Sequence, residues 1–133
     1  MSKLILVGTR NFEIEKYEIY TDVLVLGSGP SGFAAAYTAA KNGAKVIVLD
    51  ERGQNMKSTE LASIVENWQL NGTSEICFLI GGADGHLQST RDKADLILSF
   101  GKLTLPHMLM RAVLAEQIYR IQTIIAKHPY HRE

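Results

Sequence analysis

Short apolar runs, each ending at glycine or at an acidic residue, recur along the chain. They cover residues 4–7, 23–26, 46–49 and 76–80, and a weaker run covers residues 96–98. Continuous apolar runs of this length are typical of strands that are buried on both faces, as in a parallel sheet. The residues from 17 to 20 alternate between charged and apolar side chains and therefore predict an edge strand.

Helical spacing of apolar residues separates these runs. Residues 31–42 are rich in alanine, and Gly43 stands where a helix would end. Ser58 can cap a second helix, whose apolar stripe is Leu61, Ile64, Val65 and Trp68 and whose end is marked by Gly72. A last helix is predicted from about His107, and it must end before Pro129, which cannot continue a helix. Its stripe of Leu114, Ile118, Ile121 and Ile125 predicts core, a dimer contact or both.

Strands that alternate with helices predict an α/β fold, with a mainly parallel sheet and helices on both faces. The chain of 133 residues suits one domain of ordinary size, and it shows no internal repeat or linker. We therefore expect residues 1–133 to form a single domain.

Composition and charge narrow the class of protein. The 46% hydrophobic share argues against disorder, and 14 basic residues balance 14 acidic ones, which argues against binding of nucleic acid by bulk charge. The lone Cys77 cannot form an internal disulfide, and no apolar stretch approaches the ~20 residues that span a bilayer. No secretion signal is visible, so we expect a cytoplasmic protein. We also expect no membrane partner and no metal site.

A glycine-rich turn follows the second apolar run. Gly27, Gly29 and Gly32 have the G-x-G-x-x-G spacing at the predicted junction of strand and helix, and Asp50 ends the next predicted strand. Such glycines let a pyrophosphate approach the helix N-terminus, and the acid can accept a hydrogen bond from ribose. Residues 20–51 resemble the first β-α-β unit of FAD-dependent oxidoreductases, which implies an FAD or NAD site. The alternative is that the glycines only build a sharp connection.

Four motifs in the remaining sequence occur in a characteristic order. They are LDERG at 49–53, IGGADG at 80–85, LTLPH at 103–107 and HPYHR at 128–132. In this order they closely resemble the bacterial ribosomal large-subunit RNA methyltransferase H family, over residues 46–133 and 1–9. The resemblance implies a SPOUT-class enzyme that methylates a pseudouridine with S-adenosylmethionine and has a C-terminal trefoil knot. Residues 11–45 depart from the family, so the chain is interpreted as a hybrid with a Rossmann-like segment.

The predicted strand ends place a cofactor pocket. Leu49, Gly81 and Phe100 should release the chain at one edge of a parallel sheet, where ligands of open α/β sheets bind. Gly81 and Gly82 permit close approach of backbone to ligand. The resemblance implies that the loop after Phe100 wraps around S-adenosylmethionine. The residues of that loop are Gly101, Lys102, Leu103, Thr104, Leu105 and Pro106.

The resemblance also assigns catalysis to the end of the chain. It implies that Tyr130, His131 and Arg132 dock beside the cofactor of a partner subunit, so that a homodimer completes the active site. His131 or Tyr130 could help to remove a proton from a ring nitrogen of the base, and Arg132 could hold the base or a phosphate. The implied substrate is ribosomal RNA or the ribosome. Two alternatives stay open: an FAD- or NAD-binding module, and a hybrid scaffold without activity.

Overall fold

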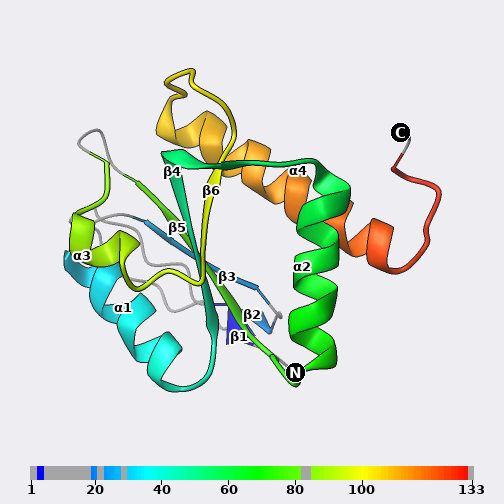
Figure 1. Cartoon of the computed structure of the whole chain (residues 1–133), viewed down its shortest axis with the longest axis horizontal. Coiled ribbons are helices and arrows are strands. Elements are labelled where there is room, and N and C mark those ends of the chain that lie inside the picture. The colour runs from blue at the N-terminus through cyan, green and yellow to red at the C-terminus, as the bar shows by residue number, and fades with distance from the viewer. Residues whose placement is uncertain (1–2, 5–18, 21–22, 28–29, 82–84, 132–133) are drawn as a thin grey trace.

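The computed structural model describes residues 3–4, 19–20, 23–27, 30–81 and 85–131. Its elements follow the chain as in Figure 1. They are β1 (Lys3–Leu4), β2 (Ile19–Tyr20), β3 (Val23–Gly27), α1 (Pro30–Lys41), β4 (Lys45–Asn55), α2 (Ser58–Leu70), β5 (Ile76–Ile80), α3 (Gln88–Arg91), β6 (Leu96–Ser99) and α4 (His107–Ile125). The predicted strand residues 5–7, and Gly29, Gly82 and Arg132, lie outside the described residues.

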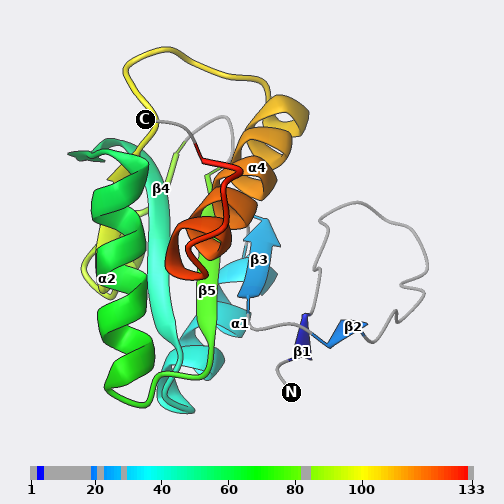
Figure 2. The same ribbon diagram turned by 90° about the vertical axis from the view of Figure 1, so that its right-hand side faces the viewer.

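The main sheet has four parallel strands in the order β3-β5-β4-β6. Every residue of β5 is buried, since the strand lies between β3 and β4 and is covered on both faces. The prediction of a parallel sheet made of continuous apolar runs is confirmed for these four strands. Figure 2 shows α2 and α4 together on one side of this sheet.

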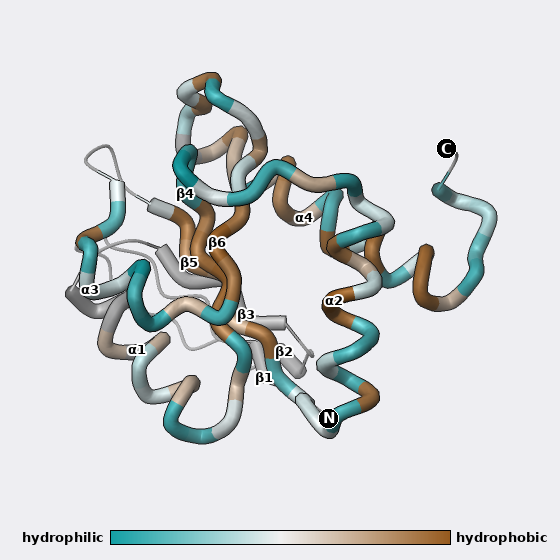
Figure 3. The backbone as a smooth tube through the Cα atoms, viewed as in Figure 1, coloured by the Kyte–Doolittle hydropathy of each residue, from teal (hydrophilic) through white to brown (hydrophobic). Residues whose placement is uncertain are grey.

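Alternate residues of the strands supply two hydrophobic cores. Ile47, Phe78 and Leu98 point to the face that is covered by α2 and α4, whereas Val48 and Leu79 point to the face covered by α1. Figure 3 shows the hydrophobic residues, in brown, concentrated along β4, β5 and β6. Helices therefore cover both faces, as the sequence predicts.

The apolar stripes of the helices pack as core. On α2, Leu61 and Val65 are buried, and Ile64 and Trp68 are partly buried against the same cluster. On α4, Leu114 and Ile121 are buried, with Ile118 and Ile125 packed beside them. The prediction that this stripe of α4 belongs to the core is confirmed, and a dimer contact of the same helix stays a prediction.

β1 and β2 form a separate two-stranded antiparallel sheet beside β3 (Figure 2). The predicted edge strand is confirmed at Ile19–Tyr20. The prediction that Leu4 belongs to a strand of the parallel sheet is wrong, because Leu4 pairs antiparallel with Ile19. Strands that pair in parallel need a long crossover connection, whereas antiparallel strands do not.

β4 is longer than predicted and bulges over β6. The strand was expected to end at Leu49 but continues to Asn55. Leu98 is aligned with both Leu49 and Gln54, so the intervening residues bulge away from the ladder. Gly53, within this bulge, lies against the backbone of β6. The bulge forms one wall of the site described below.

The cap of α2 differs from the prediction. Lys57, not Ser58, is the N-cap residue, and its backbone N–H donates to Glu60 Oε2 at 2.7 Å. The Ser58 hydroxyl instead donates to Gln117 Oε1 on α4 at 2.7 Å. Because the packing of α2 on α4 offers this partner, a residue that commonly caps helices joins two helices here. Within the described residues, no helix is long and apolar enough to cross a membrane.

Candidate cofactor site at the carboxyl edge of the sheet

A cavity of about 390 Å³ opens where β4, β5 and β6 end. Its volume lies in the range of ~300–1,000 Å³ that is usual for small-molecule sites. Residues from three strand ends line it, within the ranges 49–52 of β4, 80–86 at and after the end of β5 and 98–105 at and after the end of β6, together with Arg91 and Met110. Residues 82–84 are not described. The three strand ends are those that the sequence places at one edge, and the structure brings them together.

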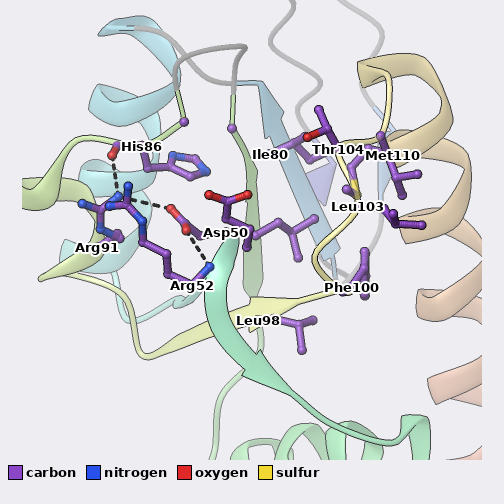
Figure 4. Close-up of a pocket in the computed structure, with 16 residues that line it drawn as sticks. Asp50, Arg52, Ile80, His86, Arg91, Leu98, Phe100, Leu103, Thr104 and Met110 are labelled. Carbon is purple, nitrogen blue, oxygen red and sulfur yellow. Dashed lines mark hydrogen bonds and ion pairs between the residues drawn. The ribbon is translucent and has the colours of Figure 1, made fainter.

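The cavity has an apolar side and a polar side. Figure 4 shows the apolar side chains, which are Ile80, Leu98, Phe100, Leu103 and Met110, across from the polar ones, which are Asp50, Arg52, His86 and Arg91. A flat apolar ring system fits the first side, and charged or hydroxyl groups fit the second. The arrangement therefore suits a ligand that is apolar at one end and polar at the other.

A buried ion pair forms the polar side. The Arg91 Nη1 atom lies 3.2 Å from Asp50 Oδ2, and the two side chains are 13% and 6% exposed. Asp50 Oδ1 also accepts the backbone N–H of Arg52 at 2.9 Å. Desolvation tends to raise the pKa of Asp50, but the Arg52 N–H and the Arg91 guanidinium outweigh it, so the pKa lies below its ordinary value of 3.8. Asp50 is therefore ionised at neutral pH.

Gly81 lines the cavity and lies close to the imidazole of His86. A Cβ atom at residue 81 would lie 3.1 Å from both Cδ2 and Nε2 of His86, so a larger residue would push the imidazole aside. His86 Nε2 is buried and has no hydrogen-bond partner within the described structure. Burial lowers the pKa of His86 below 6.5, although the nearby Asp50 carboxylate opposes this, so the ring is neutral at pH 7.

The loop after β6 begins at a tight turn. Gly101 has φ of +112°, a conformation that residues with side chains rarely adopt. The backbone N–H of Gly101 donates to Ser99 Oγ at 3.1 Å, and Ser99 is buried. These contacts direct the chain from β6 around the apolar side of the cavity, which the following loop residues line.

Most residues of the predicted cofactor site line this cavity. The lining residues among them are Leu49, Gly81, Phe100, Gly101, Leu103, Thr104 and Leu105, and Asp50, predicted only for a dinucleotide site, also lines it. Lys102 and Pro106, which were also predicted, are exposed and do not line it. Sequence reasoning missed Arg91 on α3 and Met110 on α4, because no local pattern brings residues of these helices to the strand ends. It also missed Arg52 and His86, which lie within or next to the quoted motifs.

The predicted catalytic tail lies away from the cavity of its own chain. Neither Tyr130 nor His131 lines it. The Tyr130 ring instead makes an edge contact with Tyr119 at 4.8 Å between ring centroids, and the Arg120 guanidinium lies 5.3 Å from the same ring. Arg120 forms an ion pair with Glu116, as its spacing suggests. Tyr130 therefore packs on α4.

The strand order does not support the predicted dinucleotide site. In a Rossmann unit, the strand before the glycine turn lies beside the strand that ends in the ribose-binding acid. Here β5 lies between β3, which ends at Gly27, and β4, which carries Asp50. Asp50 is also engaged by Arg91. Gly32 lies within α1.

Comparisons with known proteins identify related chains. A family model described as "Predicted SPOUT methyltransferase" matches residues 31–131. The chain is 52% identical over 90 residues to "Ribosomal RNA large subunit methyltransferase H" of Paramagnetospirillum magneticum, which covers 68% of this chain and 59% of the relative. Proteins of the same name from Novosphingobium aromaticivorans and Paracoccus denitrificans are 51% identical over 89 residues and 52% identical over 95 residues. These matches cover 67% and 71% of this chain, and 63% and 61% of the relatives.

The extent of these matches bears on the hybrid interpretation. The chain spans about three fifths of the length of the first relatives, at 59% and 63%. The family match begins at residue 31, within α1, and so includes part of the segment that was interpreted as Rossmann-like. The comparisons therefore do not support a separate dinucleotide-binding unit. With its cavity at the ends of β4, β5 and β6 and a match from residue 31 to 131, the chain belongs to the SPOUT methyltransferase family.

Proposed function

We propose that this chain is an S-adenosylmethionine-dependent methyltransferase that acts on ribosomal RNA. One observation carries the proposal: most of the residues that the family resemblance assigns to the cofactor line one cavity of about 390 Å³. The relatives at about half identity are named as ribosomal RNA large subunit methyltransferases, which supports the substrate class. We further propose a single cytoplasmic domain.

The lining of the cavity fits such a ligand. The apolar side chains Phe100, Leu103 and Met110 suit a purine ring, while Asp50 and His86 suit the ribose and amino acid groups. Gly81 and Gly101 keep side chains out of this space. When bound, the ligand supplies a methyl group that is already activated on a sulfonium. The residues of the cavity therefore need only to hold that group in line with the nucleophile and to exclude water.

We propose that the catalytic residues come from the tail of a second subunit. Tyr130 and His131 do not line the cavity of their own chain, and His131 Nδ1 is buried without a partner within the described structure. His131 or Tyr130 would take a proton from the ring nitrogen of a pseudouridine, directly or through water. Arg132, outside the described residues, would hold the base or a phosphate.

The exposed apolar residues at the start of α4 support a homodimer. Met108 and Leu109 are 74% and 48% exposed, and Leu103, in the preceding loop, is 83% exposed. A second copy of the chain that covers this surface would bring its own tail toward the cavity. We therefore propose that the dimer forms across this end of α4 and closes the site.

We also propose that the chain forms the trefoil knot of its family. Two observations support it: the bulged part of β4 lies so close to β6 that Gly53 leaves no room for a side chain, and the loop after β6 returns to the cavity before α4 begins. A dinucleotide site is not proposed, because β5 separates the two strands that it needs.

Calorimetry with S-adenosylmethionine, FAD and NAD tests the ligand. We expect binding of S-adenosylmethionine alone, and binding of FAD or NAD in its place would overturn the proposal. Transfer of a radiolabelled methyl group to ribosomes that lack the modification tests the activity. The His131→Ala variant should bind the ligand normally but transfer no methyl group.

Mixed dimers test whether the tail acts across the subunit interface. His131→Ala lacks the tail histidine, and Gly101→Val should distort the loop that lines the cavity, since a β-branched residue rarely adopts the positive φ of residue 101. Each variant alone should be inactive. A mixture of the two, allowed to exchange subunits, should regain activity, because one dimer in the mixture joins an intact cavity to an intact tail. A mixture that stays inactive while it exchanges subunits would place the tail in its own chain's site.

A further inference from the structure

Arg91 joins two segments of the cavity wall. Its Nη1 atom donates to the carbonyl oxygen of His86 at 2.8 Å and lies 3.2 Å from Asp50 Oδ2, while Nη2 donates to Gln88 Oε1 at 2.8 Å. Asp50 belongs to β4, whereas His86 precedes α3. Figure 4 shows the bonds from Arg91 to the His86 carbonyl oxygen and to Asp50 beside the cavity. A single side chain therefore sets the relative positions of the two segments.

The buried ion pair of Asp50 and Arg91 contributes little to the free energy of unfolding. Removing two charges from water costs about as much as their attraction returns, so buried pairs are weak stabilisers. What the pair supplies is rigidity: Asp50 accepts from two different residues, and Arg91 donates to three acceptors. A rigid polar wall at a ligand cavity keeps hydrogen-bonding groups where a ligand needs them.

His86 is the group that this wall presents. Its backbone carbonyl is held by Arg91, and its ring packs on Gly81 and lines the cavity. Nε2 is buried without a partner within the described structure, which is costly unless a bound molecule satisfies it. The backbone of Leu49 and of Leu79 lies near the imidazole and tends to raise its pKa, but neither forms a hydrogen bond with Nε2 within the described structure.

We propose that His86 Nε2 forms a hydrogen bond with a polar group of the bound nucleoside–amino acid ligand, and that Arg91 is its positioning residue. This inference rests on the proposed function, since it takes the cavity to bind S-adenosylmethionine. It adds two residues that the family motifs do not assign to the cofactor. Arg91 acts through Asp50 and the carbonyl of His86 and does not itself contact the ligand.

Calorimetric titration of the purified chain with S-adenosylmethionine tests the proposal. His86→Phe removes Nε2 and should weaken binding about 10- to 100-fold, the cost of one hydrogen bond to a charged or strongly polar group. Arg91→Met should weaken binding to a similar extent. Arg91→Lys should recover part of the loss, because lysine can pair with Asp50 but cannot donate to three acceptors in a fixed plane. Lys41→Met, on the far side of the sheet, should bind as the wild type does.

The double variant separates positioning from a general loss of structure. If Arg91 acts through His86, His86→Phe combined with Arg91→Met should bind no more weakly than His86→Phe alone. Additive losses would overturn the proposal. Where Arg91→Met fails to fold, as circular dichroism would show, the two His86 variants decide the question, because they leave the ion pair intact.

The pH dependence of binding gives a second readout. The charged groups that face His86 are Asp50 and Arg52 from β4 and Arg91 from α3, with Glu51 lining the same cavity. Because the pKa of His86 lies below 6.5, wild-type affinity should be constant above pH 6.5 and should fall at lower pH, as the imidazole gains a proton beside Arg91. His86→Gln, which can still form a hydrogen bond, should stay within a few-fold of wild type at pH 7.5 and lose this pH dependence. An unaltered dependence in His86→Gln would overturn the assignment.

The outcomes distinguish this inference from the proposed function. A wild-type chain that does not bind S-adenosylmethionine would overturn both. A wild-type chain that binds it, with equal affinity in His86→Phe and Arg91→Met, would overturn only the role of these two residues.

Discussion

Gly53 lies directly against the backbone of Ile97, because a Cβ atom at residue 53 would be only 2.7 Å from the Ile97 carbonyl carbon. The contact occurs in the bulge of β4 between Leu49 and Gln54, beside the residues that line the cavity. Any side chain at residue 53 would push β4 away from β6. The approach of the two strands therefore depends on a glycine.

The Gly53→Ala substitution should destabilise the protein by about 1–3 kcal/mol, the usual cost of an extra methyl group in a packed region. The midpoint of urea denaturation measures it. Gln54→Ala is a matched control, because Gln54 is exposed on the same strand, and it should change stability by no more than about 0.5 kcal/mol. Equal midpoints for the two variants would contradict the close approach.

Leu114 anchors α4 in the core. Its side chain is 1% exposed and packs in the cluster formed by β4, β5, β6 and α2. Leu114→Ala should therefore cost about 2–5 kcal/mol of stability, from lost burial and the cavity that remains. Leu70→Ala provides the comparison, since Leu70 is 79% exposed and should cost less than about 0.5 kcal/mol. A cost for Leu114→Ala as small as that of Leu70→Ala would show that α4 does not pack as described.

His86 should make stability depend on pH. Its pKa in the folded state is lowered from 6.5, mainly by burial, so the folded chain binds fewer protons than the unfolded chain below pH 6.5. Its contribution to stability is thus fully present above pH 6.5 and is lost as the pH falls through the folded pKa. The free energy of unfolding, measured by denaturation at a series of pH values from 7.5 to about 5, should show this loss, because the linkage relation places it below the unfolded pKa.

The His86→Gln variant should lose this part of the pH dependence. His128→Gln, at an exposed position, should keep it and serves as the control. If wild type and His86→Gln lose stability in parallel on acidification, another group is responsible.

Cys77 should be unreactive in the folded protein. Its side chain is fully buried, and desolvation, with a smaller contribution from Glu75, raises the pKa of the thiol to about 12. Because the thiolate is the reactive form, a disulfide reagent such as Ellman's reagent should react at pH 8 only when the chain opens. Addition of urea should release one thiol per chain, and Cys77→Ser should release none. Immediate reaction without urea would show that the core around β5 is open.

The strands were predictable because a buried strand of a parallel sheet must be apolar on both faces. The run at residues 76–80 coincides with β5, and the run at 96–98 lies within β6. The far end of β4 was not predictable, because residues 50–55 are mostly polar and become a strand only by pairing with β6. Likewise, the partner of Ser58 on α4 depends on how two helices pack.

The order of the amino acids alone determined the four strands of the main sheet, the three long helices, the family resemblance, and the three strand ends that meet at the cavity, since parallel strands end at one edge. Only the tertiary structure decided that β5 lies between β3 and β4, that Leu4 pairs outside the main sheet, and that Arg91 holds Asp50 and His86. The reason is physical: hydrophobic periodicity is local, whereas strand order and the partners of a buried charge depend on residues far apart in the chain.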